Sequence, residues 1–106
     1  MQGPKLQLVW SPEAEADLLT TWRWGATHFS PDVADSRLRD IQHAARNLID
    51  FPSSGVKRDQ IVPGVRSVVV YPTVIFYRIG SETVDIVRVV DGRRNLAAFF
   101  SADRDD

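Results

Sequence analysis

The chain has 106 residues, a formal net charge of −1, 43% hydrophobic and 25% charged residues, and no cysteine. This composition predicts a single domain over residues 1–106, and it excludes a disordered chain, a disulfide scaffold, a thiolate metal site and thiol catalysis. The sequence does not open with a basic stretch followed by an apolar run, and it has no apolar segment near ~20 residues long, so we expect a cytoplasmic protein without a membrane partner.

The first predicted elements are a strand over residues 5–10 and a helix that begins at Pro12. Apolar and polar residues alternate in KLQLVW, which is typical of a half-buried strand. Ser11 suits the N-cap of the helix, and Pro12 suits its first position. The expected buried stripe repeats every fourth residue and comprises Ala14, Leu18, Trp22 and Ala26.

A second helix is predicted from Pro31 to about Phe51. Ser30 and Pro31 repeat the same start signal, and Pro52 stops the helix. Its apolar stripe steps by three or four residues and comprises Ala34, Leu38, Ile41, Ala45 and Leu48. Because the link between the two helices is short, we expect an antiparallel helical hairpin.

Three β-rich runs follow the polar loop SSGVKRDQ, over residues 65–71, 73–79 and 83–90. Short turns between them predict an antiparallel meander. The order β-α-α-β-β-β indicates an α+β fold, an antiparallel sheet with an N-terminal α-hairpin packed on one face. The sequence DGRRNLAAFF adds a short helix or an ordered tail.

Arginines interrupt the apolar runs of the last two strands, in a region (56–94) with seven basic and four acidic residues, a net charge of +3. Strict alternation predicts two sets that each share one face: Val74, Phe76 and Arg78 in one strand, and Val84, Ile86, Arg88 and Val90 in the next. Because a hairpin covers one face of a sheet, we expect the other face to expose apolar groups and arginines, as binding surfaces do. Each arginine alone could instead snorkel, or pair with Asp85 or Glu82.

Histidine and tryptophan offer few further candidates. His28 ends the first helix, where it can cap carbonyls, and His43 is expected to face solvent. The ligand count is too low for a metal site, and no motif indicates a nucleophilic triad or a phosphate loop, so we expect no metal or cofactor. Trp24 is two residues from Trp22 and cannot face the same core, so it covers a loop or meets a partner.

The ordered motifs SPEAEADL with Trp22, the Pro and Ala of SPDVADSRL, NLIDFPSSGVKR, GVRSVVVYPTVIFYRI and VDIVRVVDGRRNL cover most of the chain. Together they resemble the ParE/RelE superfamily of toxins from type II toxin–antitoxin systems, and within it the ParE (plasmid stabilisation) branch. The resemblance implies an antiparallel sheet with a packed α-hairpin. It also implies a cognate antitoxin, a ParD-like ribbon-helix-helix protein that wraps the toxin and links it to operator DNA only indirectly.

Two targets follow from the resemblance. RelE-like members cut messenger RNA in the ribosome with basic residues on the sheet and an acid/base residue, often a C-terminal tyrosine, whereas ParE-like members poison DNA gyrase. The expected tyrosine position falls at or near Phe99 or Phe100, which carry no hydroxyl, and Lys57 is the only lysine after Lys5. These features favour a non-enzymatic, gyrase-directed toxin. The alternatives are a RelE-like ribonuclease and a degenerate member that only binds its antitoxin.

The candidate site residues form two groups. The basic surface expected to meet the target comprises Arg66, Arg88, Arg93 and Arg94. The residues expected to contact the antitoxin are Trp24, Val74, Phe76, Arg78 and Ile86.

Overall fold

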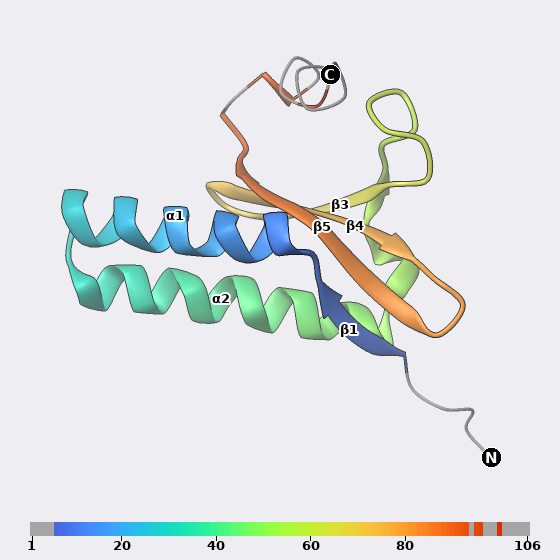
Figure 1. Cartoon of the computed structure of the whole chain (residues 1–106), viewed down its shortest axis with the longest axis horizontal. Coiled ribbons are helices and arrows are strands. Elements are labelled where there is room, and N and C mark those ends of the chain that lie inside the picture. The colour runs from blue at the N-terminus through green and yellow to red at the C-terminus, as the bar shows by residue number, and fades with distance from the viewer. Residues whose placement is uncertain (1–5, 94, 97–99, 101–106) are drawn as a thin grey trace.

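The chain folds into a helical hairpin beside a sheet (Figure 1). The computed structural model describes residues 6–93, 95–96 and 100. In chain order its elements are β1 (Gln7–Trp10), α1 (Pro12–His28), α2 (Pro31–Asp50), the 3-10 turn η1 (Pro52–Ser54), β2 (Val56–Lys57), β3 (Arg66–Val70), β4 (Thr73–Ile79) and β5 (Thr83–Asp91). This order confirms the predicted α+β fold and adds one short strand, β2, within the stretch expected to be a loop.

Both helices begin where the sequence indicates. The hydroxyls of Ser11 and Ser30 each accept a hydrogen bond from the backbone N–H three residues later, at 3.0 and 3.1 Å. The two helices then run antiparallel, and a Cβ added at Gly25 would lie 3.3 Å from the Cβ of Ala34, so they approach closely there. Neither helix in the described part of the chain is long and apolar enough to cross a membrane.

The sheet has five strands in the order β1-β5-β4-β3-β2. The pairs from β2 to β5 are antiparallel, as predicted, but β1 runs parallel to β5, so the sheet is mixed. The expectation of a wholly antiparallel sheet is wrong at this edge. Alternation in a strand shows which face is buried but not the direction of its neighbour, and the long path through both helices permits a parallel pair.

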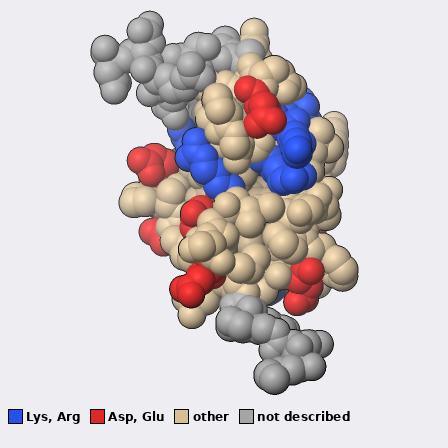
Figure 2. Space-filling view, turned by 90° about the vertical axis from the view of Figure 1, so that its right-hand side faces the viewer, with Lys and Arg blue, Asp and Glu red and all other residues tan. Residues whose placement is uncertain are grey.

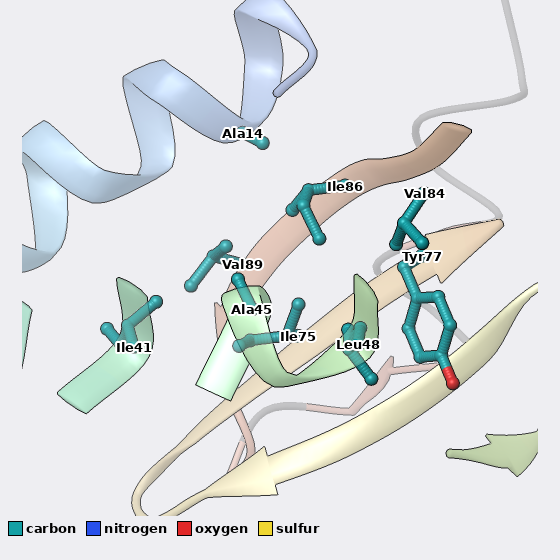
Figure 3. Packing of buried hydrophobic residues seen from close by; sticks show 9 residues of the cluster. All are labelled: Ala14, Ile41, Ala45, Leu48, Ile75, Tyr77, Val84, Ile86 and Val89. Atoms are coloured by element: carbon teal, nitrogen blue, oxygen red, sulfur yellow. The ribbon is translucent and has the colours of Figure 1, made fainter. Parts of the chain in front are cut away.

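The main core lies between the hairpin and the sheet (Figure 3). Its buried side chains come from both layers and comprise Ala14, Ile41, Ala45, Leu48, Ile75, Tyr77, Val84, Ile86 and Val89. Four of the five residues of the predicted α2 stripe are buried, and Leu38 is half-buried. In α1, Trp22 was expected in the buried stripe but is only half-buried. Its Nε1 donates to Asp35 Oδ1 at 2.7 Å, so the side chain links the two helices and does not fill the core.

A β-bulge in β5 changes the faces that alternation predicts. Phe76 pairs with Arg88 while its neighbour Tyr77 pairs with Ile86, so Val87 is left without a partner in β4. An extra residue reverses every later side chain, so Ile86 belongs to the helix-side core and does not share a face with Arg88. The N-cap serine holds the bulge, because the hydroxyl of Ser11 donates to the carbonyl oxygen of Val87 at 2.8 Å.

A second core covers the sheet face away from the helices, where we expected an open surface. Val74 and Phe76 are 6% and 0% exposed. They pack with Val90 of β5 and with side chains from the loop after β2 and from the C-terminal segment: Ile61, Val62, Val65, Leu96 and Phe100. The rings of Phe76 and Phe100 meet edge to face with centroids 4.8 Å apart. The prediction that this face exposes Val74 and Phe76 is therefore wrong, because the chain's own loop and tail cover them.

Candidate partner-binding surfaces

Arg88, expected on the target-binding surface, is held inside the fold. Its Nε and Nη2 donate to the two carboxylate oxygens of Asp17 at 2.8 and 3.0 Å, and the backbone N–H of Val89 donates to the same carboxylate at 2.9 Å. The side chains of Arg88 and Asp17 are 16% and 14% exposed. The pair connects α1 to β5, so the guanidinium serves the fold, and its partner is neither Asp85 nor Glu82.

Arg93 lies on the surface and is paired with Asp91. Its Nη2 and Nε donate to the Asp91 carboxylate at 2.6 to 3.2 Å, and its backbone N–H donates to Oδ1 at 2.9 Å. These hydrogen bonds and the carboxylate's charge raise the pKa of the Arg93 guanidinium above its usual value. Arg94, the other arginine expected here, lies outside the described residues.

Arg66 is one of four cations at the end of the sheet where β2, β3 and β4 lie side by side. Its Nη1 donates to the carbonyl oxygens of Gly55 and Ser53, at 3.0 and 3.3 Å. The four cations, here named the basic end, are Lys57, Arg58, Arg66 and Arg78, and the sheet divides them between its faces. Arg66 lies opposite Lys57 and Tyr77, so Arg78, the next residue of β4, points to the other face. None of these four forms an ion pair with a carboxylate among the residues that the structure describes. Figure 2 looks onto this side of the molecule and shows lysine and arginine in two separate groups in its upper half.

Sequence reasoning missed Lys57 and Arg58 as members of the basic end. Both fall in the stretch read as a polar loop, and the only signal was their adjacency. The pairing of β2 with β3 places Lys57 directly opposite Arg66. Arg58 is fixed by a hydrogen bond from its Nε to the hydroxyl of Ser67, at 2.8 Å.

A groove of about 230 Å³ separates the helical hairpin from the end of the sheet. This hairpin groove is lined by Trp24 and Arg37 from the helices and by Pro72, Val90 and Arg93 from the sheet side, together with Asp17 and Asp91, the partners of Arg88 and Arg93. Trp24 is 43% exposed, which confirms its predicted place on the surface.

Aromatic contacts fix the outer wall of the hairpin groove. The indole of Trp24 stacks on His28, with ring centroids 4.2 Å apart, and meets the edge of Phe29. Nδ1 of His28 lies 2.9 Å from the carbonyl oxygen of Trp24, which is the predicted cap at the end of α1. Arg37 lies over the Phe29 ring at 4.9 Å. An apolar wall beside a cation suits a partner with apolar and acidic side chains.

The five residues expected to contact an antitoxin are thus divided by the fold. Trp24 and Arg78 are exposed, whereas Val74, Phe76 and Ile86 are buried. A partner could touch the three buried residues only by displacing the segments that cover them. The accessible candidates therefore lie in the hairpin groove and at the basic end.

Comparisons with known proteins place the fold in a family. Residues 8–96 match the family described as the ParE toxin of type II toxin–antitoxin system, parDE. The chain is 36% identical to Toxin ParE1 of Mycobacterium tuberculosis over 92 residues, which cover 81% of this chain and 89% of that protein. It is 41% identical to Toxin ParE3 of Caulobacter vibrioides over 66 residues, 62% of this chain and 66% of the relative.

Solved structures show the same architecture. The chromosomal ParDE toxin–antitoxin system from P. aeruginosa matches with a TM-score of 0.72 and 25% identity, covering 82% of this chain and 96% of that chain. The toxin–antitoxin complex RelBE2 from M. tuberculosis matches with a TM-score of 0.58 and 20% identity, covering 82% of this chain and 98% of the other, and shares the fold. With the family match over most of its length, the chain belongs to the ParE toxin family of type II toxin–antitoxin systems.

Proposed function

We propose that this chain is a toxin without catalytic activity that acts on DNA gyrase in the cytoplasm and is neutralised by a ParD-like ribbon-helix-helix antitoxin. The observation that carries the proposal is the match of residues 8–96 to the ParE family, in the branch that the sequence motifs resemble. DNA gyrase as the target and a ParD-like protein as the partner are inferred from this family membership.

The second face of the sheet supports a function other than RNA cleavage. Phe100 stands near the position where a ribonuclease of this fold would carry its acid/base residue, and its ring packs against Phe76. A phenyl ring carries no proton to transfer. Of the nearby arginines, Arg58 is held by Ser67 and Arg88 by Asp17, and a guanidinium stays protonated and is a poor base.

A cleavage assay with gyrase tests the target. Purified toxin, incubated with gyrase from its host and supercoiled plasmid, is expected to raise the amount of protein-linked, cleaved DNA in proportion to toxin concentration. Plasmid and toxin without gyrase are the control and should show no cleavage. Unchanged DNA in the full reaction would refute the target.

Two further results would identify the alternatives. Cuts in messenger RNA at the ribosomal A site, mapped by primer extension after induction, would identify a ribonuclease. Induction without growth arrest would identify a degenerate member that only binds its antitoxin.

Trp24 is expected to be an anchor of the antitoxin in the hairpin groove. Replacing it with alanine removes an exposed indole beside Arg37, and we expect the affinity for the antitoxin to fall about 30-fold, the effect of a typical interface hot spot. Titration calorimetry with the antitoxin measures the change. Phe51→Ala is the matched control, because Phe51 is an exposed aromatic residue at the other end of the hairpin. Equal affinities of the two variants would remove Trp24 from the interface.

A further inference from the structure

The strand β2 forms an outer edge of the sheet and is short and exposed. It pairs with β3 through two residues, with Val56 opposite Ser67 and Lys57 opposite Arg66. An edge strand leaves one row of backbone N–H and C=O groups unpaired, which another extended chain can use. The side chains on the two faces of this edge determine which extended segment can bind there.

The first face of the edge is cationic. Lys57 and Arg66 are direct cross-strand neighbours, an arrangement that like charges make unfavourable. The carboxylate of Asp59, in the loop after β2, accepts a hydrogen bond from the backbone N–H of Gly64 at 2.9 Å and forms no ion pair with these two cations. The two cations line a hollow of about 290 Å³ together with Asp59 and with Ile79, which is also exposed. A carboxylate placed between Lys57 and Arg66 would relieve the repulsion between them.

Arg66 is also preorganised for an anion. Its Nη1 is tied to the carbonyl oxygens of Ser53 and Gly55, which fixes the plane of the guanidinium. A guanidinium that is already held in one orientation loses little conformational entropy when it binds a carboxylate.

The other face of the edge is apolar and open. Val56 is 59% exposed, and Val69, two residues beyond the partner of Val56 on β3, is 65% exposed. Since successive residues of a strand point to opposite faces, a chain added to β2 would place every second side chain against these valines. The alternate residues of the added chain would point to the other face, toward Lys57 and Arg66.

We propose that this edge binds an extended protein segment with alternating acidic and apolar residues as an added strand. A second copy of the chain fits poorly, because edge-to-edge pairing would bring together the cations of both copies. Nucleic acid would leave Val56 and Val69 without a contact, and the chain as a whole carries a net charge of −1. Assigning the segment to the antitoxin rests on the proposed function; the chemistry of the site does not.

A peptide titration tests the site directly. The probe is an acetylated, amidated Leu-Glu-Leu-Glu-Leu peptide, and its counterpart with glutamine in place of glutamate is the neutral control. In ¹⁵N-resolved NMR spectra, the acidic peptide is expected to shift the amides of Val56, Lys57 and Arg66, with an affinity at least about tenfold higher than the neutral peptide.

The variant Lys57→Glu is expected to weaken binding of the acidic peptide about tenfold, because it reverses one charge of the pair. Its melting temperature should stay the same or rise, since glutamate would face Arg66, so the loss is not unfolding. Arg39→Glu, on an exposed position of α2, is the matched control and should bind as the wild type does.

Three results would overturn the proposal: equal affinity for the two peptides, unchanged binding by Lys57→Glu, or displacement of the peptide by a short duplex DNA of random sequence. The peptide titration does not depend on toxicity, so it tests the edge site separately from the proposed action on gyrase. Peptide binding without an effect on gyrase refutes the proposed function alone, and gyrase poisoning without peptide binding refutes this site alone.

Discussion

Replacing Asp17 with alanine should lower the free energy of unfolding by about 3 kcal/mol, because it leaves a mostly buried guanidinium and one backbone N–H without their acceptor. The carboxylate receives bonds from Arg88 and Val89 and joins α1 to β5 beyond the end of β1. Urea denaturation followed by tryptophan fluorescence measures the change.

The matched control is Asp40→Ala, an exposed carboxylate on α2, which should change stability by less than about 0.5 kcal/mol. A double-mutant cycle with Arg88→Ala should show a coupling of about 1–3 kcal/mol, because the pair acts as a unit. If Asp17→Ala were as stable as the control, the ion pair would contribute nothing to the fold.

Replacing Gly55 with alanine is the second substitution expected to have a large effect. A Cβ at this position would lie 2.5 Å from the hydroxyl oxygen of Tyr77 and 2.9 Å from the carbonyl oxygen of Ser67, closer than atoms approach. Tyr77 is fully buried, so neither group can move without disturbing the core, and we expect a loss of about 3 kcal/mol. Thermal denaturation followed by circular dichroism measures it.

The same contact has a polar component that a second variant isolates. The hydroxyl of Tyr77 donates to the carbonyl oxygen of Pro52 at 2.6 Å and accepts from the backbone N–H of Gly55 at 2.9 Å. Tyr77→Phe removes both bonds without adding volume and should cost about 1–3 kcal/mol. Gly64→Ala is the control for adding a methyl group: it meets no atom within 4 Å, although its φ of +79° adds some strain of its own. Equal stability of Gly55→Ala and Gly64→Ala would contradict the steric argument.

Local signals in the sequence predicted the helices well because their cause is local. Ser11 and Ser30 cap the helices through hydrogen bonds that need only a neighbouring turn, and the apolar stripe of α2 matches its buried face. Strand β1 was also predicted, but its parallel pairing with β5 depends on a strand about 75 residues away in the sequence. The bulge at Val87 is held by Ser11, the N-cap of α1, and alternation within one strand carries no information about that contact.

The candidate site was harder to predict than the fold, because the role of an arginine depends on its neighbours in space. Arg88 and Arg66 both lie in strands and both follow a valine, yet one binds Asp17 and the other lies beside Lys57. Burial of Phe76 depends on Phe100, which no periodic pattern connects with β4. Trp24 was placed correctly on the surface, because two residues along a helix turn it away from the side on which Trp22 contacts Asp35.

The residues Thr73 to Tyr77 of β4 are buried without interruption, with one core on each side of the sheet. A strand enclosed in this way tolerates few changes, because each substitution alters packing on one side or the other. The accessible candidates, Trp24 and Lys57, lie instead on a helix and on an edge strand. New partner preferences could therefore arise at the periphery by substitution while the centre of the sheet keeps the same amino acids.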